Sequence, residues 1–173
     1  MGMYPGGNLV KLAPTVLAAA HTAGDIIFTK QEVQGAVPSR GGCSILRSVS
    51  CFVEGVSSDD DLTLLFFDND TALGEPAGDP MSDVTAAEFL AASCIGMIGL
   101  NAANNAVLVS AGTGKLYSNA STNDANSYSG APLFIKAAEG KTSIWVAMIQ
   151  PAGTLDMADT DSLSLTLGFE YLG

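Results

Sequence analysis

Hydrophobic and polar residues alternate along much of the chain in the pattern of short β-strands. The alternation is most regular in residues 163–171, where every second side chain is apolar. Residues 43–54 also alternate, with Leu46 and Phe52 as exceptions. Residues 62–67 are continuously apolar, which predicts a central strand covered on both faces. Further runs predict strands at residues 26–33, 94–100, 107–109, 133–136 and 143–149.

One segment has a helical pattern instead. Ser82 or Asp83 can cap a short helix with Glu88 pointing outward. The apolar side of this predicted helix is formed by Val84, Ala87, Phe89 and Leu90. About eight strands with one short helix predict an all-β fold, an antiparallel β-sandwich that is jelly-roll-like.

Two polar or glycine-rich segments interrupt this pattern. The first residues contain Pro5, Gly6 and Gly7, and we expect residues 1–14 to form a flexible N-terminal arm, followed by a single β-sandwich domain over residues 15–173. Residues 112–130 are the longest polar stretch and predict an exposed loop. Within that loop, Leu116, Tyr117 and Tyr128 are the apolar or aromatic side chains able to anchor a contact.

Composition narrows the possible partners. The chain has 173 residues, of which 47% are hydrophobic and only 14% charged, so we expect some apolar surface to lie under a neighbouring subunit or partner. The net charge is −11 and the basic residues are scattered singly, which argues against nucleic acid and against an anionic membrane surface. No apolar run reaches the roughly 18 residues of a membrane span, and residues 11–20 resemble mature protein more than a signal peptide. Partners are therefore expected to be proteins.

No reactive constellation is visible in the sequence. His21 is the single histidine, so a catalytic triad has no evident base, and we expect it to be an ordinary surface or turn residue. Cys43 and Cys51 lie too far apart along one predicted strand to bridge, and three buried free thiols fit synthesis in a reducing compartment. We expect Trp145, mid-strand among apolar neighbours, to be a core residue and not a sugar-stacking platform. The sequence predicts no enzyme and no cofactor.

Two further patterns resemble binding motifs only superficially. The stretch 112–115 looks like a phosphate loop, but Val109 and Leu116 replace residues that the motif requires. Aspartates at residues 59–61 and 68–70 flank one strand and lie roughly 20 Å apart, too far to share an ion. Asp156, Asp159 and Asp161 could chelate calcium, but their spacing matches no EF-hand loop. We predict no metal site, and leave calcium at an aspartate loop open.

The order of elements is similar to a known class of proteins. The segments 11–15 (KLAPT), 64–68 (LLFFD), 144–148 (IWVAM) and 161–169 (DSLSLTLGF) resemble small virion proteins of tailed bacteriophages, encoded near the major capsid protein. The resemblance implies a capsid decoration or cement protein, a homotrimer made in the host cytoplasm that binds the major capsid protein on the outer surface of the virion. The candidate interface residues are Met3, Tyr4, Pro5 and Leu9 of the arm and Tyr117 and Tyr128 of the loop.

Two other roles stay open at this stage. The chain could be a carbohydrate- or receptor-binding sandwich of a phage tail or fibre, which predicts an aromatic platform or calcium-dependent binding. It could also be a jelly-roll subunit that forms a shell itself, although it lacks the basic arm expected of a subunit that contacts the genome.

Overall fold

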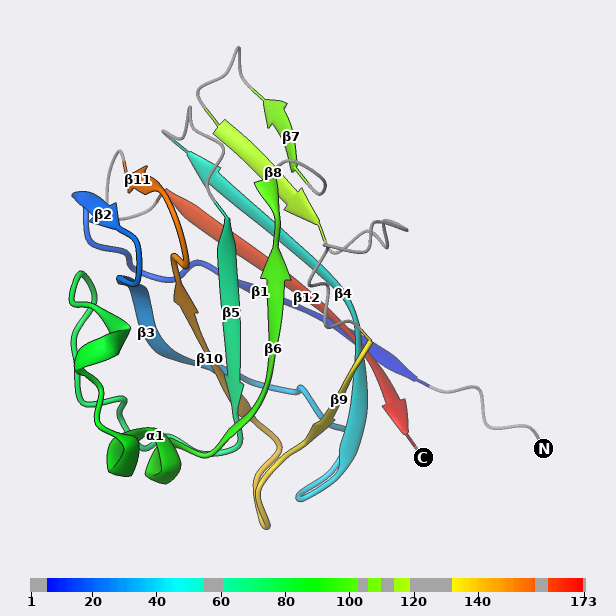
Figure 1. Cartoon of the computed structure of the whole chain (residues 1–173). Coiled ribbons are helices and arrows are strands. Elements are labelled where there is room, and N and C mark those ends of the chain that lie inside the picture. Colours follow the sequence, from blue (N-terminus) through cyan, green and yellow to red (C-terminus); the bar gives the residue numbers. More distant parts are fainter. Residues whose placement is uncertain are drawn as a thin grey trace.

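The fold is that of a computed structural model, shown in Figure 1. The structure describes residues 6–54, 61–102, 106–109, 114–118, 132–157 and 162–172. Within these ranges the chain forms twelve strands and two helical segments, and every strand pairing is antiparallel.

The strands form two main sheets and a small ribbon. The first sheet has the order β1-β12-β4-β8-β7, and β9 also pairs with β4; the second has the order β3-β10-β5-β6; the ribbon pairs β2 with β11. The first sheet consists of β1 (Gly7–Leu12), β12 (Leu163–Leu172), β4 (Cys43–Glu54), β8 (Gly114–Ser118), β7 (Ala106–Val109) and β9 (Leu133–Lys136). The remaining strands are β3 (Ile26–Val33), β10 (Ile144–Ile149), β5 (Leu62–Phe67), β6 (Cys94–Leu100), β2 (Ala20–Thr22) and β11 (Thr154–Asp156).

The strand order is that of a jelly roll. Eight strands carry it, namely β1, β3, β4, β5, β6, β8, β10 and β12. In chain order the first of these pairs with the last, the second with the seventh, the third with the sixth and the fourth with the fifth. Such nested pairing is a long hairpin folded over on itself, which produces two four-stranded sheets packed face to face. The predicted jelly-roll-like sandwich is confirmed.

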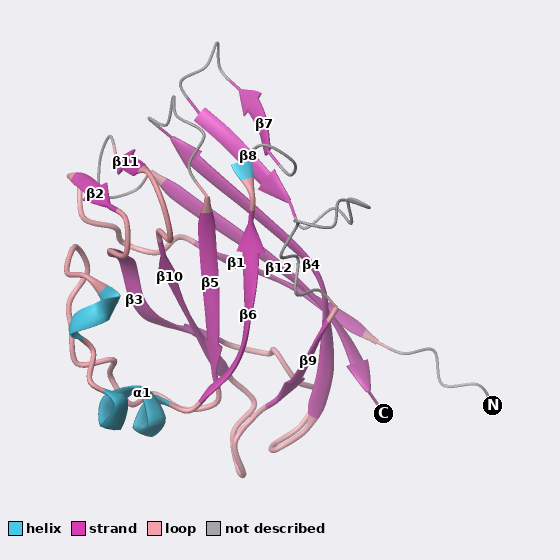
Figure 2. Cartoon of the chain, in the orientation of Figure 1, coloured by secondary structure: helices cyan, strands magenta, loops and turns pink. Residues whose placement is uncertain are grey.

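Two apolar clusters hold the layers together. The larger cluster lies between the sheets and includes Phe28, Leu64, Phe66 and Leu167. The smaller one lies on the other side of the second sheet, beneath residues 68–93, which we call the crossover because they connect β5 to β6. The crossover contains η1 (Met81–Asp83) and α1 (Ala86–Ala92), the helical turns visible in Figure 2. Because β5 is buried by both clusters, the prediction of a central strand covered on both faces is confirmed.

Strand positions follow the prediction closely. β3, β4, β5, β6 and β9 begin and end at the predicted residues, and β7, β10 and β12 differ by one residue. In β4, a register shift opposite Gly168 places both Arg47 and Ser48 on the outside. Leu46 is therefore an inward residue and not an exception to the pattern.

Three predictions are wrong in their boundaries. The arm predicted over residues 1–14 includes β1, which pairs with β12 from Gly7 to Leu12 and belongs to the first sheet. The loop predicted over residues 112–130 includes β8, which pairs with β4. Helix α1 is capped by Thr85 and not by Ser82 or Asp83, and its Leu90 is exposed although the pattern predicted it on the apolar side.

Candidate functional site

The outer faces of the two sheets differ in what covers them. On the second sheet, Leu65, Phe67 and Trp145 are buried beneath the crossover, where the Phe67 and Phe89 rings pack edge to face at 6.3 Å. This burial confirms Trp145 as a core residue and removes it as a platform for a sugar. The first sheet has no comparable layer over it among the described residues.

Strand register defines what this outer face of the first sheet presents. Leu9 of β1 lies opposite Gly168 of β12, which in turn lies opposite Ser48 of β4. A neighbouring row joins Lys11, Thr166 and Ser50, and the next joins Ser164, Phe52 and Leu116. The outward positions of β12 are thus small along most of its length, with larger side chains on the strands that flank it.

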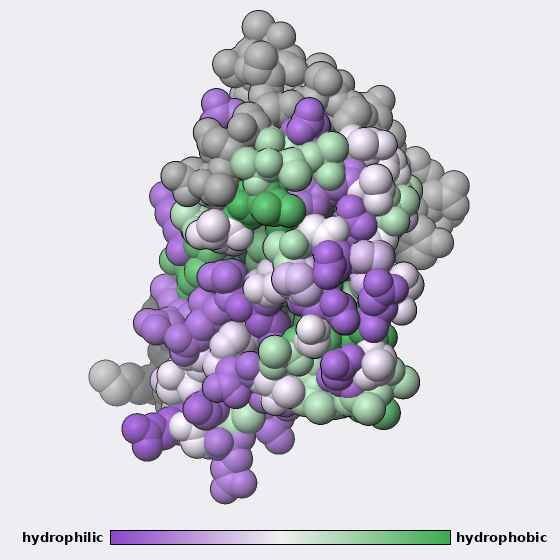
Figure 3. All heavy atoms as spheres, turned by 90° about the vertical axis from the view of Figure 1, so that its left-hand side faces the viewer, coloured by the Kyte–Doolittle hydropathy of each residue, from purple (hydrophilic) through white to green (hydrophobic). Residues whose placement is uncertain are grey.

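Exposed apolar side chains concentrate on this sheet. Among the large apolar residues of the described ranges, seven are exposed, and Leu9, Leu116, Phe134 and Leu172 all belong to strands of the first sheet. The other three are Leu17, Leu90 and Met97. Figure 3 views the molecule from the side on which β2, β3 and the crossover lie in Figure 1, and hydrophilic and apolar residues are interspersed there.

The outer face is close to electrically neutral. It carries Lys11, Arg47 and Lys136 against Glu54 and Glu170, three cations against two carboxylates. Arg47 Nε donates a hydrogen bond to Glu170 Oε2 at 2.5 Å. Since the whole chain has a net charge of −11, the acidic excess lies elsewhere on the molecule. An acidic protein therefore has one broad face on which a like-charged neighbour meets little repulsion.

The predicted interface residues lie in different environments where the structure describes them. Leu9 is 59% exposed on β1, which fits a contact role without testing it. Tyr117 is fully buried in the main core from β8, so its predicted place in an exposed loop is wrong. Met3, Tyr4, Pro5 and Tyr128 lie outside the described residues. Tyr117 was predicted in a loop because the polar residues around it hide a strand of only five residues.

His21 is not the surface or turn residue that the sequence predicted. Its side chain is fully buried on β2, with Nε2 lying 3.1 Å from the carbonyl oxygen of Leu17. Nδ1 has no hydrogen-bond partner among the described residues, and neither does the buried Oε1 of Gln150. Because no part of its ring is accessible, His21 is not available to act on a substrate in solution.

Lys30 closes the base of the crossover. Its Nζ donates to the carbonyl oxygens of Ala92 at 2.8 Å and Asn69 at 3.2 Å, and lies 4.1 Å from the centroid of the Phe67 ring. Partial burial lowers the pKa of Lys30 to about 8, opposed by the nearby Asp68. Lys30 also lines a pocket of about 340 Å³ with Asp70, Glu75 and apolar residues of the crossover. With its hydrogen bonds directed to backbone carbonyls, this lysine has a structural role.

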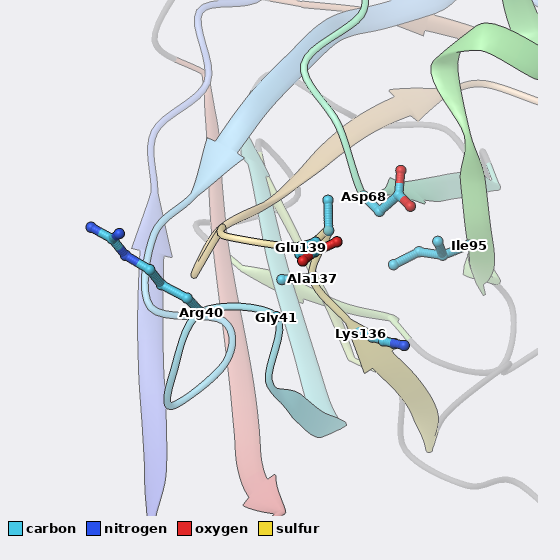
Figure 4. Close-up of a pocket in the computed structure, with 8 residues that line it drawn as sticks. Arg40, Gly41, Asp68, Ile95, Lys136, Ala137 and Glu139 are labelled. Atoms are coloured by element: carbon cyan, nitrogen blue, oxygen red, sulfur yellow. The ribbon is translucent and has the colours of Figure 1, made fainter.

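A larger pocket, of about 640 Å³, opens where β9 approaches the start of β6 (Figure 4). Its charged lining residues are Arg40, Asp68, Lys136 and Glu139, next to Ile95. Figure 4 shows the Arg40 guanidinium extending away from Asp68 and Ile95. Polar groups that converge on one point are the mark of a ligand site, and these do not converge.

The other residues considered for chemistry are structural where the structure describes them. Asp61 accepts hydrogen bonds from the Ala102 amide at 2.9 Å and from Asn101, which makes it a turn cap. Lys115 of the phosphate-loop-like stretch is buried in β8. The three cysteines carry free thiols, and burial raises the pKa of Cys51 to about 12. Asp156 is described but Asp159 and Asp161 are not.

No metal site or membrane-spanning helix is found in the described part of the chain. No group of three or more histidine, cysteine, aspartate or glutamate side chains there is placed to hold a metal ion. Likewise, none of the helices described has the length and apolar character needed to cross a membrane.

No family model matches the chain, and no curated protein matches it in sequence. Among solved structures, a chain of tomato aspermy virus is similar with 6% identity and a TM-score of 0.37, over 96% of this chain and 76% of the other. A chain of mud crab tombus-like virus is 14% identical with a TM-score of 0.31, over 100% and 84%. A chain of Penaeus vannamei nodavirus is 13% identical with a TM-score of 0.32, over 98% and 56%. The fold assignment stands on the strand order described above.

Proposed function

We propose that this chain is a non-catalytic virion structural protein. The observation that carries the proposal is the complete jelly-roll strand order around an interior filled with apolar side chains. Jelly rolls serve viral capsids, lectins and cupins. A cupin needs a cluster of metal ligands, and no group of three or more such side chains is found among the described residues. A lectin can stack sugars on an exposed tryptophan, and Trp145 is covered.

Within that role, we favour a protein that decorates or cements the outside of a phage capsid and binds its major capsid protein. The support is the sequence resemblance to small phage virion proteins and the low charge density. A capsid under pressure from its packed genome gains stability when added subunits bury apolar surface across the boundaries of its own subunits. The resemblance also implies a homotrimer on the virion surface, made in the host cytoplasm.

A second candidate is a jelly-roll subunit that forms a shell by itself. The strand order favours it, because the same two sheets build the shells of many viruses. The absence of a basic arm in the sequence speaks against direct genome contact, since the basic residues are scattered singly.

One experiment separates the two candidates. The purified protein is examined for closed particles by electron microscopy, and is then mixed with empty phage heads whose melting temperature is followed. A decoration protein stays a small oligomer, binds the heads and raises their melting temperature. Spontaneous assembly into closed particles supports the shell subunit. If the protein neither assembles nor binds heads, the virion proposal is wrong.

The carbohydrate- or receptor-binding alternative has its own test. A glycan array probed with and without a calcium chelator should show no binding in either condition if the chain is a capsid protein. Binding that the chelator abolishes would instead support a tail or fibre module with an aspartate-loop calcium site.

A further inference from the structure

We propose that the outer face of the first sheet binds a second copy of this chain, sheet against sheet. This inference deepens the virion role and rests on it for its biological meaning, but the contact itself is a property of the isolated protein. The face is the outward side of β1, β12, β4, β8 and β9, with Leu9, Thr166 and Phe52 among its residues.

The extent of the face suits a stable contact. The strands β1, β12, β4, β8 and β9 have 6, 10, 12, 5 and 4 residues. At about 3.3 Å of length and about 4.8 Å of width per residue, the face covers roughly 600 Å² in projection. A stable protein–protein interface buries about 800 Å² of accessible surface on each partner, and accessible area exceeds projected area. The face alone is therefore of the size that a dimer needs.

The charge balance of the face permits a second copy to meet it. A strongly basic partner would be attracted to the acidic remainder of the molecule, which carries the excess of a chain at −11. An acidic partner, a second copy included, is repelled by that excess except where it meets this neutral face. A second copy is itself acidic, and this neutral face is where two copies can approach without placing carboxylates against each other. Two-fold contacts use the same patch on both subunits, which a face balanced between Lys11, Arg47 and Glu170 permits.

The shape of the face permits close approach. Two sheets pack face to face at about 10 Å when side chains from both interdigitate. The outward residues Ser164, Thr166 and Gly168 form a shallow strip along β12. Leu9 leans over it, since its Cδ1 lies 3.7 Å from the position that a Cβ of Gly168 would occupy. In a two-fold contact, large side chains such as Leu9 and Phe52 of one copy can occupy the strip of the other.

The chain offers a matched pair of variants to test this contact. Leu9 and Met97 are both large apolar residues with 59% of their surface exposed, Leu9 on the first sheet and Met97 on the second. Leu9→Lys therefore places a charge in the proposed contact, and Met97→Lys places the same charge outside it. A second contact variant, Thr166→Arg, adds bulk and charge at the middle of the face on a side chain that points outward.

The measurement is the mass of the purified protein by sedimentation across a concentration series, with a thermal melt of each variant to confirm folding. We expect a dimer for the wild type, in place of the homotrimer that the sequence resemblance implies. We expect a dissociation constant raised by about tenfold or more in Leu9→Lys and Thr166→Arg, and no change in Met97→Lys. Raising the salt concentration from about 0.02 M to about 0.5 M should strengthen the dimer, because the overall repulsion between two acidic copies is screened.

Several results would overturn the inference. A wild type that is monomeric at all concentrations, or one that forms a trimer, would overturn it, because face-to-face contact joins copies in pairs. Equal weakening by Leu9→Lys and Met97→Lys would place the contact elsewhere. Binding of empty heads is measured separately on the same variants. If heads are bound but no dimer forms, this inference fails while the virion role stands. If a dimer forms but does not bind heads, this inference stands while the virion role fails.

Discussion

The ammonium group of Lys30 lies 4.1 Å above the centroid of the Phe67 ring and joins the two ends of the crossover. From this position Nζ donates to the carbonyl oxygen of Asn69, at the start of the crossover, and to that of Ala92, at the end of α1. Asn69 adds a hydrogen bond from its Nδ2 to the carbonyl oxygen of Ala91. A single side chain from β3 therefore fixes the segment that buries the outer face of the second sheet.

Replacing Lys30 by Met should loosen the crossover. The change removes the hydrogen bonds to two backbone carbonyls and the contact with the aromatic ring, at a cost of about 1 kcal/mol in the free energy of unfolding. Lys136→Met is the control, because Lys136 is exposed on β9. Urea denaturation measures both variants. Equal stability of the two would contradict the structural role of Lys30.

The same residue predicts how stability changes with pH. Burial lowers the pKa of Lys30 to about 8 in the folded chain, below its ordinary value of 10.5. Between these two values the unfolded chain binds more protons at this site than the folded chain, so this site's contribution to the free energy of unfolding rises with pH. Subtracting the pH profile of Lys30→Met from that of the wild type isolates this term. A difference that stays flat from about pH 7 to pH 10.5 would contradict the lowered pKa.

Period-2 alternation and continuous apolar runs predicted most of the strands correctly, because both patterns arise from the burial of side chains in a sheet. β5 is an example, since six successive apolar or small residues can only be accommodated with a layer on each side. The short strands were missed for a physical reason. β2 and β11 have three residues each, and β1 follows a glycine- and proline-rich start that favours a loop on local grounds. Their pairing with distant strands overrides that local preference.

The outer face of the first sheet could not be predicted from the sequence, and the reason is different. Which side of β4 points outward depends on the register shift opposite Gly168, and an extra residue in a strand leaves no clear signature in the alternation. The neutral balance of the face also depends on bringing Lys11, Arg47 and Glu170 together from three strands. Leu9 was identified as an interface candidate, but as part of an arm and not as a member of a sheet.

Thr85 provides a test of where α1 begins. Its side chain accepts a hydrogen bond from the amide of Glu88, and the carboxylate of Glu88 accepts one from the amide of Thr85, which forms a capping box. The Thr85 hydroxyl also donates to this carboxylate, and that bond, together with the one from the Thr85 amide, lowers the pKa of Glu88. Thr85→Ala should reduce the free energy of unfolding by about 1 kcal/mol. Ser82→Ala is the matched control, because Ser82 was one of the two caps that the sequence suggested, with Asp83, and its hydroxyl donates to the side chain of Asp83. A larger effect of Ser82→Ala in chemical denaturation would place the start of the helix earlier.

Gly7 tests whether the chain near its N-terminus is a strand or an arm. A Cβ added at Gly7 would lie 2.7 Å from the carbonyl oxygen of Phe169, a backbone atom of β12 that cannot move aside cheaply. Gly7→Ala should therefore displace the start of β1 and cost about 1–2 kcal/mol. In Gly6→Ala the new Cβ would meet only the ring of Tyr171, at an ordinary 3.6 Å, so that variant should be close to wild type in stability. Hydrogen exchange at the amides of Asn8 and Val10 reads out the strand directly. The bond from the Tyr171 amide to the Gly6 carbonyl oxygen sets the alternation, so these are amides of the edge strand β1 that face β12. For a paired strand we expect these amides to be protected from exchange in the wild type and in Gly6→Ala, and less protected in Gly7→Ala. Rapid exchange in all three proteins would instead show that this segment is a flexible arm.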